Sequence, residues 1–214
     1  MSNEFYSREY LIDEGVDSRL VDVLLSHSDI TKGSSLLEFF NKNRDRMGTS
    51  IINIGLSGDE CSLSWVNFFL DVLKFKKITI VEFHKPNYVQ VCDRFEGDKR
   101  VKVFHGDVRK IDTFIESNSD ACFWWHGPEH IPLADLPLAY AKLKEKTNKA
   151  MLWACPWGNY YNCGEGMYLG DGHHFYPENN HFLDLGMDVM NTGGPKDTGN
   201  ANIFAYKFFE NKDE

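Results

Sequence analysis

The sequence has few features that would direct a chain into a membrane or an oxidising compartment. No apolar run approaches the roughly 18 to 20 residues that a membrane-spanning helix needs. The first residues lack the basic-then-apolar pattern of a secretory signal. The five cysteines include no C-x-x-C pair, which argues against a disulfide framework. We therefore expect a cytoplasmic protein that does not enter a membrane.

Positive charge is also scarce. The chain has 23 Lys and Arg residues against 32 Asp and Glu residues, so its formal net charge is −9. Proteins that grip phosphate backbones over a wide surface do so through Lys and Arg. The charge therefore disfavours a nucleic-acid partner and favours a small molecule or a neutral protein surface, and nothing in the sequence fixes an oligomeric state.

Helical and strand-like patterns alternate along most of the 214 residues. Residues 1–48 read as helical, and we assign them to an N-terminal helical cap on a domain that spans 49–214. Short apolar runs then predict strands, and apolar residues one helical turn apart predict helices. The predicted strands are 50–55, 77–83, 100–107, 120–125, 149–155, 186–191 and 202–208, and the predicted helices are 19–28, 34–47, 62–75, 86–95, 108–117 and 133–147.

This alternation predicts an α/β fold. Near-continuous apolar strands that alternate with helices are typical of a parallel sheet covered on both faces. The last two strands are separated only by TGGPKDTG, which is too short for a helical crossover, so they should pair antiparallel. In an open parallel sheet, ligands bind beyond the carboxyl ends of the strands. The candidate site should therefore lie there.

The first predicted strand is followed by IGLSGDECS. Gly55 and Gly58 allow backbone to come close to a ligand, and we expect the helix N-terminus behind them to offer free N–H groups. A tight strand-to-helix turn explains the same residues without a ligand. The second strand ends in Glu82, whose carboxylate could accept two hydrogen bonds from a ribose diol. An exposed acid at a strand end is the alternative.

Two further residues extend this interpretation. Phe83 follows Glu82 and could lie against a purine ring. Asp107 ends the third strand in HGD and could accept a hydrogen bond from an exocyclic amine of the base. Asp107 could also cap the helix that begins at Val108, and both roles can hold at once.

The fourth strand runs into FWWHGPEHIP, residues 123–132. Histidine titrates near pH ~6.5, so His126 or His130 could act as a general base, with Glu129 orienting one of them. A Gly-Pro turn in which the His and Glu side chains bond to backbone groups is the structural alternative. We assign His126, Glu129 and His130 as the candidate catalytic residues.

The string H-x-x-E-H in this loop also occurs in inverse zinc peptidases. There the two histidines lie on one helix, which Gly127 and Pro128 disfavour here. We therefore assign no metal ligand. A glycine-rich loop predicted over 164–182 contains three histidines that could bind metal or simply be solvated, namely His173, His174 and His181.

Together these motifs resemble the class I S-adenosylmethionine-dependent methyltransferases over residues 50–208. The resemblance rests on IINIGLSGDECS, VEF, HGD, DACFWWHG and the closing strand pair. It implies a Rossmann-like three-layer sandwich with a mostly parallel seven-stranded sheet of order 3-2-1-4-5-7-6, in which the C-terminal strand is antiparallel. It also implies S-adenosylmethionine as the cofactor.

The resemblance assigns roles to the residues at the strand ends. It places Gly55 and Gly58 beside the methionine part of the cofactor, Glu82 on the ribose and Asp107 on the adenine. Asn53 stands where the family commonly has Asp or Glu to help hold the methionine ammonium group.

The acceptor is less well defined. The fourth strand is not followed by the [DN]-P-P-[YFW] motif of enzymes that methylate amino groups of adenine or glutamine. HGPEH instead resembles the DG-x-H loop of some small-molecule O-methyltransferases. The expected activity is thus methyl transfer to an acceptor that the sequence does not identify, and an oxygen of a small molecule is the candidate. A non-catalytic adenosyl-ligand binder or scaffold with the same fold is the alternative, and Asn53 favours it.

Overall fold

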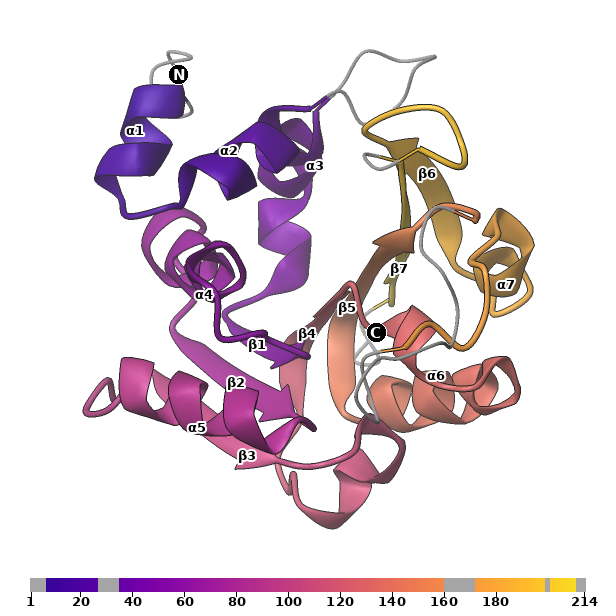
Figure 1. Ribbon diagram of the computed structural model, residues 1–214. Coiled ribbons are helices and arrows are strands. Elements are labelled where there is room, and N and C mark those ends of the chain that lie inside the picture. The colour runs from indigo at the N-terminus through magenta and orange to yellow at the C-terminus, as the bar shows by residue number, and fades with distance from the viewer. Residues whose placement is uncertain (1–6, 27–34, 160–171, 199–200, 211–214) are drawn as a thin grey trace.

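A single seven-stranded sheet forms the centre of the molecule in the computed structural model (Figure 1). The strand order is β3-β2-β1-β4-β5-β7-β6. Strands β1 to β5 all run in the same direction, and β7 is antiparallel to both of its neighbours, β5 and β6. The predicted sheet is confirmed. The structure describes residues 7–26, 35–159, 172–198 and 201–210. The strands are β1 (Ser50–Ile54), β2 (Lys77–Glu82), β3 (Val101–His105), β4 (Ser119–Trp125), β5 (Thr147–Pro156), β6 (Asp188–Thr192) and β7 (Asn202–Phe208).

Helices cover both faces of the sheet, as the three-layer prediction requires. In Figure 1, α1 to α4 lie on one side of the sheet, and α6 and α7 lie on the other. None of the described helices is long and apolar enough to cross a bilayer. The α-helices are α1 (Arg8–Asp13), α2 (Ser18–Leu25), α3 (Leu36–Asn43), α4 (Glu60–Asn67), α5 (Lys85–Arg94), α6 (Leu136–Glu145) and α7 (Asn179–Leu183). Shorter helical turns are η2 (Arg44–Met47), η3 (Phe68–Val72), η4 (Val108–Thr113), η5 (Pro128–His130) and η6 (Leu133–Asp135).

The apolar strands bury both of their faces because successive side chains point to opposite sides of the sheet. On β1, Ile51 belongs to the core under α1 to α4, whereas Ile52 belongs to the core under α6 and α7. The N-terminal helices share the first of these cores. The ring of Phe40 in α3 lies 6.3 Å from that of Phe123 in β4 and 6.1 Å from that of Phe204 in β7.

Three predicted segments differ in the structure. The helix predicted over 62–75 begins as α4 and continues as a π-helix, η3, in which all residues but Asp71 are buried. The segment 108–117 forms only the 3-10 helix η4, because its backbone kinks at Lys110. Within the predicted loop 164–182, α7 begins at Asn179, since the fully buried Phe182 anchors a short helix to the sheet. Residues 164–171 lie outside the described ranges.

Candidate functional site

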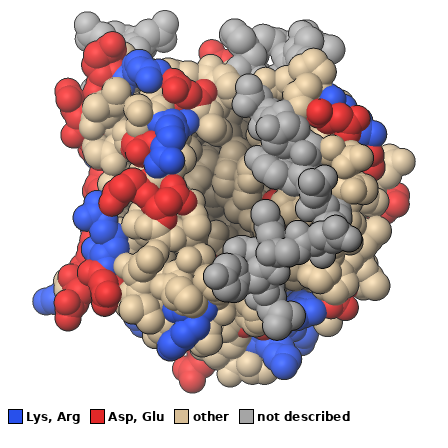
Figure 2. Space-filling model, viewed as in Figure 1, with Lys and Arg blue, Asp and Glu red and all other residues tan. Residues whose placement is uncertain are grey.

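A cleft of about 490 Å³ opens where β1, β2 and β4 reach their carboxyl ends. Figure 2 shows this face of the molecule hollowed near its centre, with acidic and basic side chains scattered around it rather than gathered in a basic patch. The volume lies in the range of roughly 300–1,000 Å³ that is usual for small-molecule sites. The cleft is lined by most of the residues predicted from the sequence, namely Asn53, Gly55, Glu82, Phe83, Asp107, His126 and His130.

The end of β1 forms one wall of the cleft. Gly55 has a φ of +71°, and its N–H donates to the carbonyl oxygen of Val81 at 2.9 Å. Side chains rarely adopt that backbone conformation, so the turn requires glycine. Asn53 is 1% exposed, and its Nδ2 has no hydrogen-bond partner among the described residues. Because an unsatisfied buried donor costs roughly 1–3 kcal/mol, an acceptor atom of a ligand would stabilise this wall.

The turn after Gly55 differs from the prediction. A Cβ on Gly58 would lie 1.4 Å from Oε1 of Gln90, so Gly58 allows α5 to pack closely, and it does not line the cleft. The expectation of free N–H groups at the start of α4 is wrong for two of them. Asp59 caps the helix and accepts hydrogen bonds from the N–H groups of Cys61 and Ser62, at 3.0 and 3.2 Å. Asp is a common N-cap residue for this reason.

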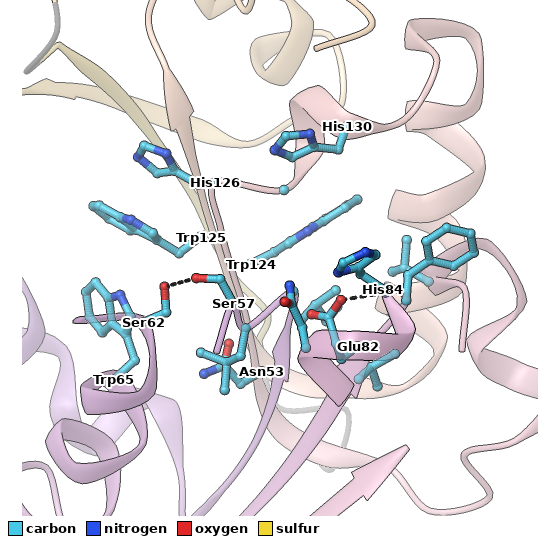
Figure 3. Close-up of a pocket in the computed structure, with 18 of the residues that line it drawn as sticks. Asn53, Ser57, Ser62, Trp65, Glu82, His84, Trp124, Trp125, His126 and His130 are labelled. Carbon is cyan, nitrogen blue, oxygen red and sulfur yellow. Dashed lines mark hydrogen bonds between the residues drawn. The ribbon is translucent and has the colours of Figure 1, made fainter. Parts of the chain in front are cut away.

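The end of β2 places a buried carboxylate at the cleft. Glu82 is 4% exposed, and its Oε1 accepts a hydrogen bond from the N–H of His84 at 2.6 Å (Figure 3). Phe83 is 57% exposed, which is unusual for a phenylalanine beside a buried strand. Nε2 of His105 in β3 lies 2.9 Å from the carbonyl oxygen of Phe83 and ties the two strand ends together.

Asp107 caps η4, as one of its two predicted roles requires. It accepts hydrogen bonds from the backbone N–H of Arg109 at 2.9 Å and from the guanidinium at 2.7 to 3.0 Å. Burial alone would raise the pKa of Asp107, but the bonds from Arg109 outweigh it and hold the pKa below its ordinary value. Asp107 also lines the cleft, and its contact with an adenine stays a prediction.

The loop after β4 forms the opposite wall, and Figure 3 shows His126 and His130 side by side there. His126 has a φ of +48°, and its Nε2 lies 3.0 Å from Oδ1 of Asn202. Burial lowers the pKa of His126 to about 4, so its ring is neutral at neutral pH. A Cβ on Gly127 would lie 1.7 Å from Nε1 of Trp124, so only glycine fits between the loop and this indole.

Glu129 lies behind that wall rather than in the cleft lining. Its side chain is fully buried, and neither carboxylate oxygen has a hydrogen-bond partner among the described residues. Oε1 lies 3.8 Å from Nε2 of His130 and 4.0 Å from Nε2 of His173. Burial raises the pKa of Glu129 to about 8 and lowers that of His173 to about 4. The predicted pair is thus joined by a histidine from a distant segment.

Comparisons with known proteins bear on the fold. The sequence matches no protein-family model, and a search of curated proteins finds no match. Solved structures do match. The N-methyltransferase NodS from Bradyrhizobium japonicum WM9 superposes with a TM-score of 0.56 over 99% of each chain, at 10% identity. The chain has the class I methyltransferase fold.

Two other structures with this methyltransferase fold show how varied its acceptors are. CalS10 from Micromonospora echinaspora, an amino pentose methyltransferase solved with S-adenosylmethionine bound, has a TM-score of 0.54 and 14% identity over 82% of this chain and 92% of its own. A protein from Clostridium thermocellum described as an rRNA-methylase has a TM-score of 0.54 and 10% identity over 82% and 96%. Identities this low establish the fold and leave the acceptor open.

Several cleft residues escape the sequence patterns. Arg19 of α2 reaches the cleft, where its Nη2 lies 3.6 Å from Oδ1 of Asp59. No local pattern signals this contact, because 40 residues separate the two along the chain. Trp124 reads as one more apolar residue of a buried strand. Others that line the cleft are Ser57, Ser62, Trp65, Asn87 and Arg109.

Proposed function

We propose that the protein is an S-adenosylmethionine-dependent methyltransferase that binds its cofactor in the cleft and methylates an oxygen of a small molecule. The observation that carries this proposal is the meeting of Asn53, Glu82 and Phe83 in one cleft at the carboxyl ends of β1 and β2. The resemblance predicts that the positions of Asn53 and Glu82 hold the methionine and ribose parts of the cofactor, and Phe83 follows Glu82 where its ring could lie against the purine.

The residues present fit such a ligand. The buried Nδ2 of Asn53 has no partner among the described residues, and a carboxylate of the ligand would accept its hydrogen bond. Glu82 offers a buried carboxylate to a diol, and the hydrogen bond from His84 holds that carboxylate in place. Phe83 presents an exposed ring to a flat heterocycle, which would cover apolar surface now in water.

The opposite wall carries the groups that would act on the acceptor. When bound, the sulfonium supplies an activated methyl group, so the chain has mainly to orient the nucleophile and remove its proton. Nε2 of His126 donates to Oδ1 of Asn202, which leaves the lone pair of Nδ1 to take a proton. His130 lines the same wall, and Oε1 of Glu129 lies 3.8 Å from its Nε2.

A small acceptor agrees with the size and charge of the site. The cleft holds about 490 Å³, and the net charge of −9 disfavours a polyanion. The second candidate function is a non-catalytic protein that binds an adenosyl ligand. Asn53 favours it, because an amide replaces the carboxylate that commonly helps to hold the methionine ammonium group.

Calorimetry with S-adenosylmethionine and S-adenosylhomocysteine tests the cofactor. We expect both to bind wild type, and Glu82→Ala to weaken binding by about 100-fold or more, since two hydrogen bonds to a charged group contribute about 3 kcal/mol. Glu116→Ala, at an exposed position outside the cleft, is the control and should bind as wild type does. Failure of wild type to bind either compound would contradict the methyltransferase and the adenosyl-ligand binder, and would favour a scaffold with this fold.

Turnover separates the two functions. His126→Ala should leave cofactor affinity unchanged and abolish formation of S-adenosylhomocysteine across a panel of hydroxylated acceptors, measured by mass spectrometry. Wild type that binds the cofactor but methylates none of the panel favours the non-catalytic alternative. Turnover that survives His126→Ala would remove His126 from the mechanism.

A further inference from the structure

The strongest unexplained feature of the molecule is the buried carboxylate of Glu129. Its side chain is 0% exposed, and neither oxygen receives a hydrogen bond from the described residues. The other buried acid among the described residues, Glu82, differs in this respect, because it accepts the N–H of His84. Carboxylates buried in proteins are paired or coordinate a metal, because an isolated charge in an apolar surrounding is very costly.

We propose that Glu129, His130 and His173 bind a divalent transition-metal ion. Their ligand atoms, one oxygen and two imidazole nitrogens, all lie within 4.8 Å of one another. A tetrahedral ion with ligand distances of ~2.0–2.2 Å separates its ligand atoms by roughly 3.4 Å. The observed separations of 3.8 and 4.0 Å from Oε1 to the two Nε2 atoms therefore need only small side-chain rotations to close around an ion.

The backbone holds the two parts of this cluster together without the ion. The N–H of His174 donates to the carbonyl oxygen of Glu129 at 2.8 Å, which fixes the segment of His173 beside η5. The N–H of His130 donates to the carbonyl oxygen of Gly127 at 3.0 Å and closes the 3-10 turn. The rings of His130 and His173 are nearly perpendicular, at 86°, with centroids 5.1 Å apart. The site is thus largely preformed. It takes Glu129 and His130 from the H-x-x-E-H string, but its second histidine is His173 and not His126.

The ligand set selects the kind of metal. Two imidazoles and one carboxylate suit Zn²⁺ and its neighbours Co²⁺, Ni²⁺ and Fe²⁺, whereas Mg²⁺ and Ca²⁺ prefer oxygen ligands. Three protein ligands also leave at least one position open, as catalytic zinc sites do. A structural zinc site would instead use four protein ligands.

The open position determines what else the ion would bind. His130 also lines the cleft, in the same loop as His126. An ion bound to His130 would therefore lie at the cleft wall. Its open position would take a water or, if the proposed methyltransferase activity holds, the hydroxyl oxygen of the acceptor. A metal ion lowers the pKa of a bound hydroxyl and so would assist its deprotonation. This last step rests on the proposed function, but the metal site does not.

Metal titration tests the site directly. The full chain is stripped with a chelator, dialysed, and titrated with Zn²⁺ by calorimetry and with Co²⁺ by visible absorption. We expect one equivalent of each to bind to the cluster, with a Co²⁺ spectrum of a site that has nitrogen and oxygen ligands. Mg²⁺ at the same concentration should not compete. Wild type that binds no equivalent of Zn²⁺ or Co²⁺ would overturn the proposal, whatever the variants do.

Variants locate the ion. His173→Ala should weaken Zn²⁺ binding by more than about 100-fold, because loss of a ligand exceeds the 10–100-fold effect of losing an outer partner. His174→Ala is the matched control: it alters the neighbouring, exposed imidazole and should leave affinity within about twofold of wild type. Equal affinities for wild type and His173→Ala would place the ion elsewhere.

Glu129→Gln keeps the side-chain volume and removes the charge, so it checks the carboxylate without a large cavity. It should weaken Zn²⁺ binding as His173→Ala does, with an unchanged circular dichroism spectrum. Calorimetry with S-adenosylmethionine on the stripped protein keeps the two proposals apart. Cofactor binding without metal binding overturns only the metal site, and metal binding without cofactor binding overturns only the proposed function.

Discussion

Two carboxylates at opposite ends of β4, those of Asp120 and Glu129, differ in their hydrogen bonds and in their pKa values. Asp120 lies near the amino end, where its Oδ2 accepts the N–H groups of Thr49 and Ser50 at 2.7 and 3.2 Å, and Lys149 lies 3.8 Å from its Oδ1. Burial alone would raise the pKa of Asp120, but these contacts outweigh it and lower the pKa. Glu129, beyond the carboxyl end, has no such donors among the described residues, and burial raises its pKa to about 8.

The two acids therefore have different roles at the two ends of β4: Asp120 stabilises the sheet, and Glu129 lies where a ligand can bind. At the amino end the carboxylate of Asp120 accepts backbone N–H groups at the start of β1 and so joins β1 to β4. At the carboxyl end, burial raises the pKa of Glu129 to about 8 beside a cleft, where proteins place strongly perturbed groups that act on ligands. Substitutions at the two ends should therefore have opposite profiles, with a loss of stability at one and a loss of binding at the other.

The largest loss of stability is expected from Asp120→Ala. It removes the acceptor of two backbone N–H groups at the amino end of β1, a central strand, and we expect the free energy of unfolding to fall by about 3 kcal/mol. Urea denaturation measures this. Asp112→Ala is the control, since its ion pair with Lys142 is exposed to solvent and should contribute little to stability. Equal losses in both variants would remove the contrast on which the comparison rests.

Gly127→Ala should cost about 1–3 kcal/mol by overpacking. The added Cβ meets the indole of Trp124 at 1.7 Å, and the shift of that ring should also weaken ligand binding, because Trp124 lines the cleft. A double-mutant cycle with Trp124→Leu, measured by urea denaturation, tests whether this clash is the cause. The double variant should lose less stability than the sum of the losses in the two single variants. Strict additivity would mean that the glycine is needed for another reason.

Glu129→Gln should change the free energy of unfolding of metal-free protein by less than about 1 kcal/mol, because no hydrogen bond to the carboxylate is lost. Asp120→Asn, the same chemical change at the other end of β4, should be more destabilising. Both are compared by urea denaturation at pH 7 in the presence of a chelator. A larger loss for Glu129→Gln than for Asp120→Asn would show that the buried acid is stabilised by contacts of its own.

The smallest effect concerns pH. Because the folded pKa of Asp120 lies below its unfolded value of about 3.9, the unfolded chain takes up the proton first as the pH falls. The stabilisation by Asp120 is therefore full above that value and is lost as the pH drops through the folded pKa. The stability difference between wild type and Asp120→Asn should be constant from pH ~7 to ~5 and shrink below pH ~4. A constant difference down to acid unfolding would be inconsistent with a lowered pKa.

The sequence predicts the sheet well because its strands are buried on both faces and read as apolar runs, as in SIINIG and KITIVEF. It also places Glu82 and Phe83 at a strand end, where parallel strands deliver their residues to one edge. The antiparallel final pair follows from the length of a single loop. These features depend on local patterns and on general rules for parallel sheets.

Contacts between distant segments were not predictable in the same way. Gly58 serves the packing of Gln90, and Asp59 takes the N–H groups that a ligand was expected to use. His173 lies 44 residues along the chain from Glu129, yet Nε2 of His173 lies 4.0 Å from Oε1 of Glu129 in the folded protein. No periodic pattern in the sequence predicts such a contact, because the two residues are far apart along the chain.

The central claim is that the cleft holds an adenosine-bearing cofactor with its ribose on Glu82. A crystal structure of the protein with S-adenosylhomocysteine tests it most directly. The ribose hydroxyls should lie within ~2.6–3.2 Å of the Glu82 carboxylate, and the amino acid part should lie beside Asn53. A ligand bound elsewhere, or a Glu82 side chain directed away from the ribose, would contradict it.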